Sequence, residues 1–231
     1  MDTATAMTTL RWLHIAAGTL ALFVAPIAML TVKGGPTHRR WGKVYFWAMA
    51  LVAASAVVLG LWRPNIFLTL LALFSFYMAF SGYRSLSRKR PAHGQGPRGI
   101  DWIGALVTLV ASVAMIVLGL VRPGPAWQRV GIVPVIFGVL GIVLAGLDLA
   151  KFVRPPEDRH AWWFAHMAGM LGSYIATVSA FSVVNFTFLP TTARWLWPTV
   201  IGTPLITLWI VYYKLSFRRR AGAPAEVATS G

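Results

Sequence analysis

The stretch DWIGALVTLVASVAMIVLGLV, residues 101–121, decides what kind of protein this is. After Asp101 it holds no charged side chain, and it has the length that a helix needs to cross roughly 30 Å of hydrocarbon. In lipid, every backbone N–H and C=O must find its partner within the protein. Such a stretch therefore predicts a membrane-spanning helix.

The rest of the chain repeats this pattern. Hydrophobic residues make up 57% of the 231 residues and charged residues 12%, about half the share of a soluble domain. We expect an all-α integral membrane bundle, with one domain over residues 1–217 and a basic, disordered cytoplasmic tail over 218–231. The expected spans are about seven: 10–32, 44–62, 66–84, 101–121, 131–153, 164–186 and 200–217.

The basic residues are distributed unevenly between the two sides of this arrangement. Of the Lys and Arg residues, 16 fall on one side and 5 on the other. The richer side is expected to be cytoplasmic, which puts the N-terminus outside and the C-terminus inside. The basic residues behind the net charge of +15 are then expected to set the orientation of the chain and to contact anionic lipid headgroups. Nucleic acid is not expected as a partner. The expected partners are the lipid bilayer and either another membrane protein or further copies of the chain.

Two segments of the chain match each other. VLGLWRP at 58–64 resembles VLGLVRP at 117–123, and both close a span that runs outward. The second and third spans therefore look like a duplicate of the fourth and fifth in parallel orientation. Parallel repeats occur in transporters, but also in inert bundles.

Polar residues form one stripe along the sixth span. The stripe comprises His166, Met170, Ser173, Tyr174, Thr177, Phe181 and Asn185. At 100° per residue these positions share about a third of the helical wheel. Lipid would penalise them, so the stripe is expected either to line a pocket or pathway or to form hydrogen bonds with neighbouring helices.

His14 belongs to the same group of candidate pocket residues. It is followed on nearly the same helix face by Gly18, Ala21 and Ala25. Small residues allow close approach of a flat ligand or of another helix, and both readings stay open.

Charged residues near the inner ends of the spans are candidates for proton transfer or ion pairing. Asp148 and Lys151 are spaced for a helical i,i+3 pair, and Arg84 is a second possible neutraliser of Asp148. Asp101 opens the fourth span at the same interface. A structural ion pair is the first interpretation, and a proton-relay carboxylate is the alternative.

The histidines also suggest a haem or metal site. His166 can pair with either His38 or His160 at the inner side, whereas His14 lies near the opposite face of the bilayer. A single b-type haem is therefore allowed, although the sequence leaves the cofactor open. The chain has no cysteine, which excludes thiolate metal sites and disulfides. It also lacks a zinc pattern, a catalytic triad and a phosphate loop, so an enzyme is not expected.

Three segments resemble the signatures of a known family. They are HIAAG at 14–18, HRRWGKVY at 38–45, and HAWW at 160–163 followed by Tyr174. They are similar to those of a group of bacterial multi-pass membrane proteins named domain of unknown function twenty-three-oh-six. Ala161 stands where a basic residue is usual. The resemblance implies a helical fold in the bacterial inner membrane and supplies no reaction.

Three functions follow as hypotheses. The first is a small-molecule or proton/ion-coupled transporter that uses the stripe of the sixth span. The second is a haem-binding redox protein, and the third is a non-catalytic partner or assembly subunit of a membrane complex. The sequence ranks a pocket or transport role first.

Overall fold

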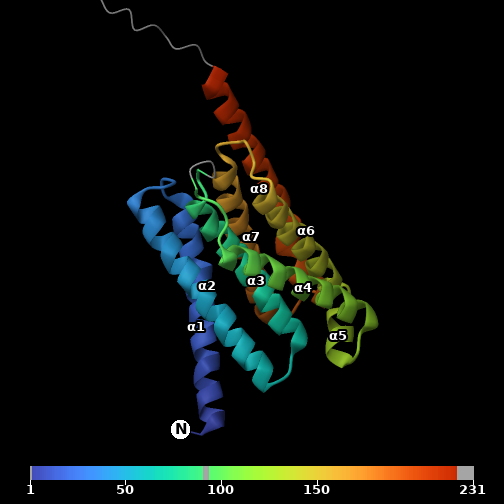
Figure 1. Cartoon of the computed structure of the whole chain (residues 1–231). Helices are drawn as coiled ribbons and strands as arrows, with labels where there is room; N and C mark the ends of the chain where they lie inside the picture. The colour runs from blue at the N-terminus through green and yellow to red at the C-terminus, as the bar shows by residue number, and fades with distance from the viewer. Residues whose placement is uncertain (1, 91–93, 223–231) are drawn as a thin grey trace, which may run out of the picture.

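The structure, a computed structural model, describes residues 2–90 and 94–222, and within these residues its secondary structure consists of helices joined by loops, without strands (Figure 1). The helices are α1 (Thr3–Leu30), α2 (Pro36–Trp62), α3 (Ile66–Arg84), the 3-10 turn η1 (Ser85–Ser87), α4 (Gly99–Val121), α5 (Pro125–Val130), α6 (Val133–Val153), α7 (Ala161–Asn185) and α8 (Thr191–Gly222). Seven of them are long and apolar enough to cross a membrane. The predicted all-α membrane bundle is confirmed, and the short α5 is an addition to it.

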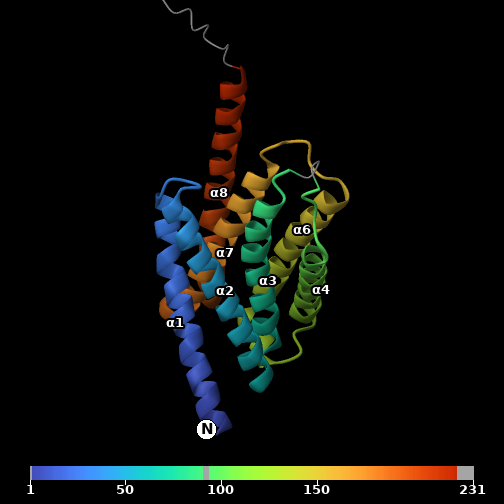
Figure 2. The same ribbon diagram turned by 60° about the vertical axis from the view of Figure 1, so that its left-hand side comes forward.

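The helices form one bundle in which α3 lies at the centre. α1 packs along α2, α4 packs along α6, and α3 contacts α2, α4 and α7 (Figure 2). α8 lies against α7 and continues beyond the other helices (Figure 1). It reaches Gly222, past the predicted limit of the last span, and residues 223–231 of the expected tail lie outside the described part of the chain. α1 begins at one end of the bundle and α8 ends at the other (Figures 1 and 2).

The interior is filled by aromatic residues and by small residues at close helix contacts. Phe67, Phe74 and Phe137 are buried between α3 and α6, beside Trp195 of α8. Ala21 and Ala25 are buried where α1 meets α2. Large apolar side chains cover the outside, and no residue in the most apolar part of α8 is buried. An exterior covered by large apolar side chains suits a protein that is surrounded by hydrocarbon.

The two matching segments of the chain end their helices differently. After α2, Arg63 is extended and Asn65 caps α3 by accepting a hydrogen bond from the Leu68 N–H at 3.1 Å, so the chain turns at once. After α4, Arg122 takes a left-handed conformation with φ of 50°, and α5 precedes α6. Residues 63–65 thus form a tight turn, whereas the corresponding connection after α4 is longer.

One end of the bundle collects the basic loops, and we call it the basic end. It comprises the α1–α2 loop, the described residues between η1 and α4, the α6–α7 loop and the C-terminal part of α8 (Figure 2). Its cytoplasmic orientation stays a prediction from the charge asymmetry.

Candidate functional site

A cavity of about 410 Å³ opens at the basic end, and we call it the basic cavity. Its wall is built from α1, α2, the segment after α3, α7 and α8. The volume lies within the range of small-molecule sites, roughly 300–1,000 Å³. The residues that line it include four cationic side chains, two histidines and several aromatic rings.

Two histidines meet in this cavity, His38 from the first turn of α2 and His166 from α7. Their ring centroids lie 6.2 Å apart, with the ring planes at 74°. The Nδ1 of His38 lies 2.8 Å from the Ala28 carbonyl oxygen, and the Nδ1 of His166 lies 2.9 Å from the Gly82 carbonyl oxygen. A carbonyl only accepts, so Nδ1 carries the hydrogen in both rings. In the neutral rings the lone pair is therefore on Nε2.

Local backbone features position the two histidines. Gly34 has φ of 77°, a left-handed conformation that reverses the chain after α1, and Pro36 then starts α2. Gly82 of α3 and Gly169 of α7 touch: a Cβ on Gly169 would lie 2.6 Å from Gly82 Cα. This close approach brings the Gly82 carbonyl to the His166 ring.

The cationic residues of the basic cavity are Lys33, Arg39, Lys43 and Lys89. Lys33 donates to the Met29 carbonyl and lies 5.5 Å from the Trp209 ring centroid. Lys89 lies 4.7 Å from the Trp162 ring centroid. Within the described chain, none of the four lies within ion-pair distance of a carboxylate. Partial burial lowers the pKa of Lys33, because burial disfavours its charged form.

Tyr45 lines the cavity and ties α2 to α7. Its hydroxyl lies 2.8 Å from Ser173 Oγ and 3.5 Å from Thr177 Oγ1, and all three residues are buried. These bonds join the helices beside the cavity, on the side away from the basic loops.

The predicted stripe of α7 is thus divided into parts with different surroundings. His166 and Met170 line the basic cavity, and Ser173 and Thr177 bond to Tyr45. Tyr174 packs beside the core between α1 and α2. Asn185 is exposed, and its side chain donates to the Phe181 carbonyl of its own helix at 2.8 Å. The stripe therefore combines both predicted roles, a pocket wall and a helix–helix contact.

The remaining candidate histidines lie elsewhere. His14 Nδ1 is 2.9 Å from Ser55 Oγ and 3.1 Å from the Val52 carbonyl, so it joins α1 to α2. The His160 ring stacks on Phe217 with centroids 4.5 Å apart. Neither lines the basic cavity, and His38 is the histidine that the fold brings to His166.

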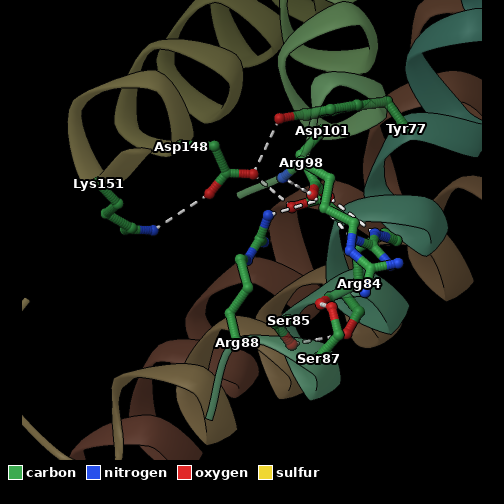
Figure 3. Close-up of polar contacts among 11 residues, drawn as sticks. Tyr77, Arg84, Ser85, Ser87, Arg88, Arg98, Asp101, Asp148 and Lys151 are labelled. Carbon is green, nitrogen blue, oxygen red and sulfur yellow. Dashed lines mark hydrogen bonds and ion pairs between the residues drawn. The ribbon is translucent and has the colours of Figure 1, made fainter. Parts of the chain in front are cut away.

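A second polar site lies on the other face of α3, and its centre is Asp101, which is 1% exposed (Figure 3). The carboxylate accepts from Nε and Nη2 of Arg84, both at 2.9 Å, and from the Arg98 backbone N–H at 2.8 Å. Arg88 Nη1 lies 3.1 Å from it. Asp101 therefore fastens the start of α4 to the end of α3.

Asp148 of α6 lies beside this arrangement (Figure 3). It accepts from the Tyr77 hydroxyl at 2.9 Å, from the Ser81 hydroxyl, and from Lys151 at 3.3 Å. The predicted pair with Lys151 is present. Arg84, considered as a neutraliser of Asp148, instead pairs with Asp101, because both lie at the α3–α4 junction. We call Tyr77, Arg84, Arg88, Asp101, Asp148 and Lys151 the ion-pair cluster.

Comparison with known proteins adds no relative. No protein-family model, no curated protein and no solved structure matches this chain. The resemblance noted from its three segments stays a prediction.

The sequence interpretation missed the cations and tryptophans of the cavity wall. The basic residues, Lys33, Lys43 and Lys89 among them, were interpreted only in terms of membrane topology, and Trp162 and Trp163 only as part of a family signature. The available signal was the segment KGGPTHRRWGK at 33–43, where basic residues and a histidine crowd around a Gly-Gly-Pro turn.

Proposed function

We propose that this multi-pass membrane protein binds a flat, amphipathic anion in its basic cavity, at the cytoplasmic face of the bacterial inner membrane. The observation that carries the proposal is the composition of the cavity wall. Lys33, Arg39, Lys43 and Lys89 contribute positive charge, and Trp162, Trp163 and Trp209 contribute ring surface. Lysine and arginine favour anions, while aromatic faces favour flat apolar groups.

The electrostatics of the cavity favour a ligand with a carboxylate, sulfonate or phosphate group. The four cations lack a carboxylate partner within the described residues. Burying them against a neutral ligand would cost solvation without compensation, whereas an anion offsets that cost. The apolar part of the same ligand would lie against Met167, Met170 and Leu171.

The test uses two probes that differ in charge but share a flat ring system. Purified protein in nanodiscs of zwitterionic lipid is titrated with 1-pyrenebutyrate and with 1-pyrenebutylamine. Energy transfer from tryptophan to pyrene reports binding. Saturable binding of the carboxylate, and none of the amine beyond empty nanodiscs, is expected. Equal partitioning of both probes, with no saturation, would contradict the proposal.

Transport is the second candidate function, and the position of Tyr45 favours it. The hydroxyls of Ser173 and Thr177 continue from the cavity along α7 and are held by Tyr45. A carrier would break these bonds to extend the cavity across the bundle. Uptake of 1-pyrenebutyrate into proteoliposomes that is lost in the Tyr45→Ala variant would support transport. Binding of the probe without uptake would indicate that the protein binds its ligand but does not transport it.

A further inference from the structure

The two histidines of the basic cavity define its ligand more closely than the positive charge of the cavity does. We infer that His38 and His166 ligate the iron of one b-type haem, a flat amphipathic anion whose carboxylates face the cationic side chains of the cavity. This inference rests on the proposed function, since it names the ligand of the same site.

Backbone carbonyls orient the two histidine rings. Each Nδ1–H is held by a backbone carbonyl, His38 by Ala28 at 2.8 Å and His166 by Gly82 at 2.9 Å. Metal-binding histidines are commonly oriented in this way, by a hydrogen bond from the nitrogen that does not bind the metal. The Nε2 lone pairs of both rings are thus left for a ligand.

The separation of the two rings suits one iron between them. Two imidazoles on opposite faces of one iron have centroids roughly 6 Å apart, because each metal–nitrogen bond is about 2 Å long. The centroids of His38 and His166 lie 6.2 Å apart. The interplanar angle of 74° is compatible with this arrangement, since each axial ring can rotate about its own metal–nitrogen bond.

The number of protein ligands favours haem over a bare metal ion. The described residues contain no group of three or more His, Cys, Asp or Glu side chains that could hold a metal ion. A bare zinc ion needs three or four such ligands. A porphyrin supplies four nitrogens itself, so two histidines complete the coordination of its iron.

The other histidines of the described chain do not fit this role. His14 bonds to Ser55 between α1 and α2, and His160 stacks on Phe217 outside the cavity. They therefore serve as matched controls, because replacing them removes an imidazole without touching the cavity.

The test compares haemin with metal-free protoporphyrin IX, which has the same rings and carboxylates but no iron. Both are titrated into the purified protein in nanodiscs. Haemin should give a low-spin, six-coordinate spectrum, oxidised and after dithionite reduction. His38→Gly and His166→Gly should weaken haemin binding by more than about 100-fold and leave metal-free porphyrin binding unchanged. Added imidazole should restore the low-spin spectrum, and His160→Ala should match the wild type.

Two results would overturn the inference. If haemin binds without a low-spin spectrum, or equally well to both glycine variants, then iron ligation is wrong while anion binding stands. If neither porphyrin binds, the haem assignment fails, and the titration with 1-pyrenebutyrate decides the proposed function separately. Retained binding of metal-free porphyrin in the glycine variants shows that they are folded.

Discussion

The basic cavity and the ion-pair cluster lie on two sides of the same segment, the end of α3 and η1, yet they treat charge in opposite ways. In the cluster, Arg84 and Arg88 converge on a carboxylate that is 1% exposed (Figure 3). In the cavity, Lys33 and Lys89 face tryptophan rings. The cluster satisfies its charges internally and so holds the fold together. The cavity leaves its positive charges without a carboxylate partner among the described residues, so they can bind an anionic ligand.

The segment from Tyr83 to Lys89 connects the two regions. Arg84 and Arg88 point to α4, whereas Tyr83, Leu86 and Lys89 line the cavity. The ion pairs therefore fix the backbone that presents one wall of the cavity. Weakening the cluster should lower stability first and ligand affinity second, whereas changes to the cavity cations should alter affinity alone.

The largest effect is expected from Asp101→Asn. The substitution leaves Arg84 and Arg88 without a countercharge at a buried site, which typically costs about 3–5 kcal/mol. Thermal unfolding of the protein in nanodiscs, followed by loss of helical signal, measures it. A change below about 1 kcal/mol would mean that the cluster does not stabilise the α3–α4 junction.

Gly169→Ala should have the next largest effect. The added Cβ would lie 2.6 Å from Gly82 Cα and 2.7 Å from the Met78 carbonyl oxygen, so α3 and α7 must separate. Overpacking of this kind costs about 1–3 kcal/mol, and it also moves the Gly82 carbonyl that orients His166. Stability and probe affinity are both expected to fall. Gly146→Ala, where the Cβ would meet nothing within 4 Å, is the control: it should lower neither stability nor affinity, because alanine favours a helix more than glycine does.

These effects also show what the sequence was able to predict. Seven apolar stretches predict seven spans because hydrocarbon thickness fixes the length of each. The pair of Asp148 and Lys151 was predictable because both residues lie on one helix. Arg84 was matched to the wrong carboxylate, since its choice of Asp101 depends on how α3 packs against α4. The cavity depends on segments far apart in the chain, and the stripe of α7 alone did not locate it.

Tyr45→Phe tests how much the hydrogen bond between α2 and α7 contributes to stability, at the point where the cavity meets the interior of the bundle. It removes a buried hydroxyl bonded to Ser173, which should cost about 1 kcal/mol. The cost stays small because Ser173 Oγ still donates to the Met170 carbonyl at 2.8 Å. The change is measured by thermal unfolding. A loss of several kcal/mol would instead indicate that this bond holds α2 and α7 together.

The smallest effect on stability is expected from Lys151→Gln. The lysine side chain is 46% exposed, and exposed pairs contribute less than about 1 kcal/mol. Asp148 keeps the hydroxyls of Tyr77 and Ser81 as partners. Unfolding within error of the wild type is expected. A large loss would show that Lys151 neutralises Asp148 on its own.

The central claim is that the cations of the basic cavity bind a ligand, whereas the cations of the ion-pair cluster do not. It is tested most directly by charge removal on each side of the segment: the double variant Lys33→Gln/Lys89→Gln, the single variant Lys151→Gln and the wild type are each titrated with 1-pyrenebutyrate in nanodiscs. The account predicts at least a 10-fold loss of affinity in the double variant, about 1.4 kcal/mol, with wild-type unfolding, and no loss of affinity in Lys151→Gln. Equal affinities in all three proteins would contradict it.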